Sequence, residues 1–214
     1  MGGINLVTLV IIGINVLMSF KGFKDYTFFH QYKFSIRELQ QGQKIRLISS
    51  GFLHVDTTHL FVNMLTLYFF ADTVIYYVGE LYFVLIYMGS LLLGNFLSYA
   101  FHKSEPLYSA VGASGAVIGV LYSAILLRPD MMLGLFFIIP IPAYVFGVGY
   151  LLYSIWAMKS KTDNIGHDAH LGGAIGGFVI TLLLFPSLLF TSFWMVILLA
   201  IPIIILFFYY RSNT

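Results

Sequence analysis

The chain has 214 residues, of which 59% are hydrophobic and only 9% are charged. Soluble domains carry about 25% charged residues, so this deficit excludes an ordinary water-soluble domain and indicates a polytopic membrane protein. Eleven Lys and Arg residues against nine Asp and Glu residues form no basic block, which argues against nucleic-acid binding, and the absence of cysteine excludes disulfides and thiolate sites.

Seven apolar runs follow one another, each long enough for a spanning helix. The first, Ile4–Phe20, follows an uncharged start, so we expect a span and not a cleavable signal peptide. The stretch of about 21–57 mixes basic and aromatic side chains, which is typical of a segment embedded in the headgroup layer. The other runs are Thr58–Val78, Leu81–Phe101, Val111–Leu127, Met131–Met158, His167–Phe185 and Thr191–Tyr210.

The fifth run, Met131–Met158, is overlong and contains Pro140 and Pro142, so we expect a kink, a tilt or a half-unwound segment there. A break at Lys159–Asn164 follows it. The runs are continuous instead of alternating, which makes strands implausible. The sequence therefore predicts an all-α polytopic membrane protein.

Polar side chains within the runs are few, and most of them belong to one membrane face. His59 and Asn63 are four residues apart, so they share a face of the second run, and His54 precedes them. Ser114 opens the fourth run and His170 opens the sixth. Because even-numbered spans all start at the same membrane face, these five side chains should converge there.

Glycines indicate how closely the fourth and sixth runs approach. Small residues four apart let helices pack backbone to backbone in lipid, which would bring Ser114 and His170 within hydrogen-bonding reach. The glycines in question are Gly115 and Gly119 in the fourth run, and Gly172, Gly173, Gly176 and Gly177 in the sixth.

This set of residues suits nucleophilic catalysis. A serine hydroxyl is a poor nucleophile until an imidazole accepts its proton, and Ser114 and His170 supply both groups. His59, Asn63 and the backbone N–H of Ser114 could stabilise the developing oxyanion. The soluble-hydrolase motif Gly-x-Ser-x-Gly is not met, because residue 116 is Ala.

In these motifs the sequence resembles the rhomboid intramembrane serine proteases. The resemblance covers about Gln43 to Gly177. It rests on Arg46, Gly51-Phe52-Leu53-His54, His59-xxx-Asn63, Gly112-Ala113-Ser114-Gly115, and Ala169-His170-Leu171-Gly172-Gly173 with Gly177. It implies a catalytic core of six transmembrane helices over residues 1–185 and one additional C-terminal helix over 186–214.

The resemblance also implies roles. Ser114 would be the nucleophile, His170 the general base, and His59 and Asn63, supported by Gly112 and His54, would form the oxyanion hole with backbone amides. Transmembrane proteins would be the substrates, no cofactor would be needed, and the active site would face the extracytoplasmic side of the cell membrane.

Three positions depart from the family pattern, one of them Ile75, where the family frequently has a carboxylate near the end of the second helix. Ile118 stands where the family often places an aromatic residue against the catalytic imidazole, and Ile45 stands where a Trp commonly precedes the loop arginine.

Three other functions remain open at this stage. Four histidines on one face suggest a metal protease, but no His-Glu-x-x-His motif accompanies them. A catalytically inactive rhomboid-like binding or trafficking factor would usually lack Ser114 or His170. A transporter would show a repeat between its halves, and none is visible.

Three further polar residues have simpler explanations. We interpret His167 as a loop histidine at a helix start and Asp168 as a capping or first-turn acid. Asp72, far from the Ser114 face, is expected to form an internal hydrogen bond or an anchor at the cytoplasmic side.

Charge counting conflicts with the orientation that the resemblance implies. Ten of the eleven Lys and Arg residues fall on the Ser114 side and only Arg128 falls opposite, so the positive-inside rule would place the site in the cytoplasm. Six of the ten lie in the long first loop. We expect that loop to be a packed element and follow the resemblance.

Overall fold

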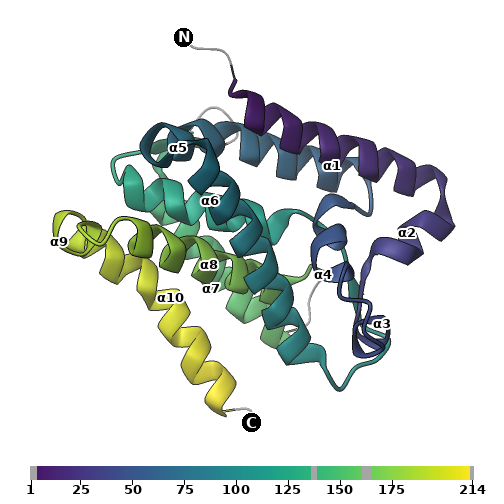
Figure 1. The fold of residues 1–214 in the computed structure, drawn as a ribbon. Helices are drawn as coiled ribbons and strands as arrows, with labels where there is room; N and C mark the ends of the chain where they lie inside the picture. The colour runs from purple at the N-terminus through teal and green to yellow at the C-terminus, as the bar shows by residue number, and fades with distance from the viewer. Residues whose placement is uncertain (1–3, 136–138, 161–164, 213–214) are drawn as a thin grey trace.

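The computed structural model describes residues 4–135, 139–160 and 165–212. Its long helices pack across one another into one bundle (Figure 1), which confirms the predicted all-α polytopic membrane fold. Helices α1, α5 and α8 are long and apolar enough to cross a membrane, and three shorter apolar helices accompany them. The long helices are α1 (Leu6–Lys24), α5 (Thr57–His102), α6 (Ser114–Leu127), α7 (Ala143–Ser160), α8 (His167–Leu184) and α10 (Phe193–Ser212).

Helix α5 contains the second and third predicted spans, joined at Gly79. The backbone there has φ 79°, a left-handed conformation that glycine adopts without steric penalty. Both ends of α5 line the same cavity, through His59 and His102, so the chain reverses direction at this turn. In Figure 1 the first arm runs beside α1, and the second descends across the front of the bundle.

The start of α1 is attached near this turn. The backbone N–H of Asn5 donates to a carboxylate oxygen of Asp72 at 3.4 Å, and the Asn5 amide donates to Glu80 at 2.9 Å. Asp72 is exposed and lies at the end of the bundle opposite Ser114. It therefore anchors the first helix, as the sequence suggested.

The first loop is a packed element of short segments. Arg46 is 5% exposed, and its guanidinium donates to the carbonyls of His30 and Lys33, both at 2.8 Å. Phe34 and Ile36 are fully buried. The segments are α2 (Tyr26–Tyr32), β1 (Phe34–Ser35), α3 (Ile36–Gln40), α4 (Arg46–Ser49) and η1 (Ser50–Phe52).

The prediction that strands are implausible in the apolar runs was wrong for the fifth run, and a further short strand pair lies outside the runs. Strand β1 pairs with β2 (Ser109–Ala110), and β3 (Met132–Leu135) pairs with β4 (Ile139–Pro142) in an antiparallel hairpin. Pro140 and Pro142 therefore lie in a strand, and α7 begins only after them. Proline lacks an N–H and clashes with the preceding turn of a helix, whereas a two-stranded ribbon accepts it at an edge. Residues 136–138 of the fifth run and 161–164 of the following break lie outside the described residues.

Helix α6 is the buried centre of the bundle, between α5 and α8. All its residues from Gly115 to Leu126 are buried. The two predicted glycine pairs of α8 face different neighbours. A Cβ at Gly173 or Gly177 would overlap the carbonyl oxygen of Gly115 or Gly119 on α6. A Cβ at Gly172 would lie 2.6 Å from the Leu93 carbonyl oxygen on α5, and one at Gly176 would lie 2.8 Å from the Ser90 Cα.

The end of the chain follows a short helix, α9 (Leu188–Thr191), and packs α10 against α7. Pro202 lies inside α10. The division into a core over 1–185 and an added helix over 186–214 stays a prediction.

Candidate active site

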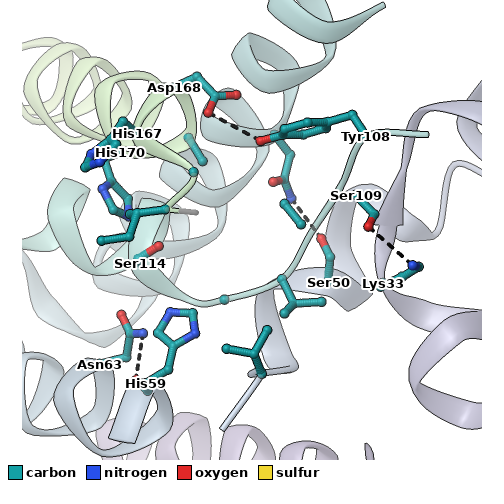
Figure 2. Close-up of a pocket in the computed structure, with 18 of the residues that line it drawn as sticks. Lys33, Ser50, His59, Asn63, Tyr108, Ser109, Ser114, His167, Asp168 and His170 are labelled. Carbon is teal, nitrogen blue, oxygen red and sulfur yellow. Dashed lines mark hydrogen bonds between the residues drawn. The ribbon is translucent and has the colours of Figure 1, made fainter. Parts of the chain in front are cut away.

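A cavity of about 1140 Å³ lies at the end of the bundle where α6 and α8 begin. Ser114, His170, His59, Asn63 and Gly112 all line it. Figure 2 shows Ser114 beside His170, with His59 and Asn63 below them. The structure thus brings together five of the six residues predicted for catalysis and its support.

Ser114 is the first residue of α6, three residues later than the predicted start of that helix. The preceding segment is held from two sides. Strand β2 pairs with β1 of the first loop, and the N–H of Gly112 donates to the Ser50 carbonyl at 3.0 Å. Ser114 therefore stands at the exit of a fixed loop, with its side chain half-buried at the cavity.

Gly112 has φ 136°, a conformation that side-chain-bearing residues rarely adopt. A Cβ there would lie 2.8 Å from Cε1 of His59, so glycine is also needed for space. The N–H of Gly112 is already bonded to the Ser50 carbonyl, so Gly112 supports the shape of the site, and other groups must donate to an oxyanion.

His170 lies in the first turn of α8 and is 3% exposed. The close approach of the two helices brings it next to Ser114. A Cβ on Gly115 would lie 3.0 Å from the carbonyl oxygen of Ala169, the residue before His170. From α7, the hydroxyl of Tyr150 lies 2.9 Å from His170 Nδ1.

Candidate N–H donors come from the start of α6 and from the side chain of Asn63. The first N–H groups of a helix have no acceptor within the helix, which leaves those of Ser114 and Gly115 for another partner. The Asn63 amide donates one N–H to the His59 carbonyl at 3.0 Å and has a second N–H. The His59 backbone is capped by Asp56, whose carboxylate accepts its N–H at 2.7 Å.

His54 does not line the cavity. It is fully buried, and burial lowers its pKa from 6.5 to about 3, so the ring is neutral. Its Nε2 accepts the N–H of Ala113 at 3.4 Å, and its Nδ1 lies 2.9 Å from the Ser19 hydroxyl. Both ring nitrogens are therefore used in connecting α1 to the residue before Ser114.

His167 is not the loop histidine that the sequence suggested. It is the first residue of α8, is 3% exposed, and its Nδ1 lies 3.1 Å from the Ser154 hydroxyl on α7. The residues around His167 in the sequence could not show that α7 places the Ser154 hydroxyl beside this imidazole.

Asp168 lies in the first turn of α8, and Gly166 takes the capping position. Its carboxylate accepts a hydrogen bond from the Tyr108 hydroxyl at 3.5 Å and lies 3.6 Å from His102 Nε2 (Figure 2 shows the first contact). Burial, together with the negative charge of Asp168, raises the pKa of Tyr108 above its usual range. Asp168 thus connects the loop before Ser114 to α8.

A metal centre finds no support in the described part of the chain. No group of three or more His, Asp or Glu side chains there is placed to hold a metal ion.

The sequence reasoning missed Tyr150, Ser154 and Tyr108. Tyr150 and Ser154 are four residues apart on α7, so they share a face, and this spacing was readable. The interpretation of residues 131–158 as one helix obscured which face of α7 meets α8.

Comparison with known proteins identifies the family of this chain. The rhomboid domain model matches residues 41–187, which is more than half of the chain and includes every candidate site residue. This chain belongs to the rhomboid family and is a membrane protein of that family.

Three relatives illustrate the similarity. RHOMBOID-like protein 12, mitochondrial, of Arabidopsis thaliana is 29% identical over 181 residues, 78% of this chain and 54% of the plant protein. The human presenilin-associated rhomboid-like protein, mitochondrial, is 31% identical over 137 residues, 61% of this chain and 35% of the human protein. Putative rhomboid protease YdcA of Bacillus subtilis (strain 168) is 33% identical over 145 residues, 66% of this chain and 68% of that protein. The chain spans about half the length of the plant relative, and less of the human one.

Proposed function

We propose that this chain is an intramembrane serine endopeptidase that cleaves transmembrane segments of other membrane proteins with a Ser114–His170 dyad. The observation that carries the proposal is the glycine contact between α6 and α8. This contact holds the starts of the two helices together. Ser114 and the imidazole of His170 therefore lie at one cavity, in a protein whose surroundings are apolar.

In this mechanism His170 accepts the Ser114 proton while Oγ attacks the substrate carbonyl. The oxyanion receives hydrogen bonds from the Ser114 N–H and from the side chains of His59 and Asn63. His170 then protonates the leaving amine, and a water molecule from the cavity hydrolyses the acyl-enzyme. A substrate helix must unwind locally, because its carbonyls are otherwise hydrogen-bonded within the helix.

The proposed location is the cell membrane, with the cavity open to the extracytoplasmic side. Packing of the first loop removes two cations from the charge count that opposes this orientation. Arg46 is buried against loop carbonyls, and Lys33 donates to the Ser109 hydroxyl at 3.2 Å, so these cations are part of the fold.

The test is reaction of the purified protein with a fluorophosphonate probe. Wild type and Ser109→Ala are expected to be labelled, because Ser109 lines the cavity but lies on strand β2, away from the helix start. Ser114→Ala is expected to lose labelling and to stop cleaving a reporter membrane substrate. Equal labelling of Ser114→Ala and wild type would reject the dyad. Inhibition by chelators with indifference to the probe would favour the metal protease, and substrate binding without any labelling would favour an inactive binding factor.

A further inference from the structure

In the described part of the chain, hydrogen bonds between polar side chains connect α7 to α8. Tyr150 and Ser154 lie four residues apart on α7, and His167 and His170 lie three apart on α8, so each pair shares a helix face. The Tyr150 hydroxyl meets His170 Nδ1 at 2.9 Å, and the Ser154 hydroxyl meets His167 Nδ1 at 3.1 Å. The proposed base is therefore in direct contact with a side chain from a third helix.

The chemistry of a dyad determines the direction of the Tyr150 bond. A neutral imidazole has one nitrogen that donates and one that accepts. To accept the Ser114 proton, His170 must keep the lone pair of Nε2, and its proton must be on Nδ1. The Nδ1–H then donates to the phenol oxygen of Tyr150. If the phenol donated instead, the proton of the ring would be on Nε2 and the dyad could not start.

Tyr150 also contacts the imidazole through its ring. The two ring centroids are 5.6 Å apart with an interplanar angle of 36°. Position 118, where the family often has an aromatic residue, holds an isoleucine packed into the core. In this chain α7 supplies an aromatic neighbour of His170 through Tyr150.

The carboxylate nearest in sequence is directed elsewhere. Asp168 accepts from Tyr108 and faces His102, on the side of the loop before Ser114. In a catalytic triad, a carboxylate accepts a hydrogen bond from Nδ1–H of the base; the group at that position of His170 is the neutral phenol oxygen of Tyr150.

We propose that Tyr150 is a positioning residue for His170: its phenol oxygen accepts a hydrogen bond from Nδ1–H and fixes the tautomer and orientation in which Nε2 faces Ser114. This inference rests on the proposed dyad.

The decisive variant is Tyr150→Phe, which keeps the ring and removes only the oxygen. We expect kcat for a reporter substrate, and the rate of fluorophosphonate labelling, to fall on the order of tenfold with KM unchanged. Ser154→Ala is the matched control. It removes the α7–α8 hydrogen bond between Ser154 and His167, and we expect it to lower the melting temperature at least as much while kcat stays near the wild-type value.

A spectroscopic readout separates positioning from packing. In the Ser114→Ala background with ¹⁵N-labelled histidine, the signal assigned through His170→Ala is expected to show the Nδ1–H tautomer. Tyr150→Phe should convert that signal to a mixture of tautomers. An unchanged tautomer, a wild-type kcat in Tyr150→Phe, or an equal loss of kcat in Ser154→Ala would each overturn the proposal. Because the tautomer is read without catalysis, failure of the dyad itself would appear separately, as undiminished labelling of Ser114→Ala.

Discussion

At the scale of single residues, the site depends on groups that never touch a substrate. His54 accepts the Ala113 N–H, and its Nδ1–H donates to Ser19, whose hydroxyl in turn donates to the Phe52 carbonyl at 3.2 Å. This chain of hydrogen bonds has one consistent direction, because His54 and Ser19 each act once as donor and once as acceptor. It connects α1, the first loop and the residue before Ser114.

His54→Gln should therefore destabilise the protein in a pH-dependent way. At pH 7.5 we expect a loss of about 1–3 kcal/mol, because buried groups lose their partners. The folded pKa of about 3 lies below the unfolded value of 6.5, so the unfolded chain binds more protons as pH falls. The wild-type contribution is complete above pH 6.5 and declines steadily as pH falls towards 3.

Thermal unfolding in mild detergent at pH 7.5, 6 and 4.5 measures this effect. The gap in melting temperature between wild type and His54→Gln should narrow at each step, since effects of the carboxylates cancel in the comparison. A gap that stays constant from pH 7.5 to 4.5 would contradict a neutral, buried His54.

At the scale of helices, the contact between α6 and α8 is made by backbone atoms. Side chains at such a contact could adjust by changing rotamer, whereas carbonyl oxygens can move only with their helix. A methyl group at Gly173 would overlap the carbonyl of Gly115, one residue after Ser114. Helix spacing and site geometry are therefore coupled.

We expect Gly173→Ala to lower the free energy of unfolding by about 1–3 kcal/mol and to slow fluorophosphonate labelling. Gly149→Ala on α7 is the control, because a Cβ there meets no atom within 4 Å. Alanine is the better helix former, so this variant should keep or slightly raise the melting temperature. Equal melting temperatures for the two variants would show that α8 can move away from α6 at little energetic cost.

At the scale of the whole molecule, the proposed orientation can be tested with single cysteines, since the natural chain has none. Lys103 lies exposed after α5 on the Ser114 face, and Arg128 lies exposed after α6 on the opposite face. In intact cells, an impermeant thiol reagent should label Lys103→Cys directly and Arg128→Cys only after lysis. The reverse pattern would place the cavity in the cytoplasm.

Much of this architecture could be predicted from the sequence. Length and hydropathy are sufficient to locate apolar helices, and the alternation of spans brought Ser114, His170, His59 and Asn63 to one end. The β3–β4 hairpin could not be found this way, because a short apolar strand and a helix turn have the same composition. Tyr150 was missed because residues 131–158 were interpreted as one helix, so the shared face of Tyr150 and Ser154 was not matched to α8.

The left-handed turn at Gly79 also bears on how the chain enters a bilayer. The two helical arms of α5 meet at a single residue, so no loop between them has to cross the bilayer separately. We therefore expect the two arms to insert together as a hairpin. The residue next to the turn is Glu80, which is acidic, whereas basic residues are the ones that retain a loop inside the cell. The orientation of the hairpin must then be decided during synthesis by the segments on either side of α5.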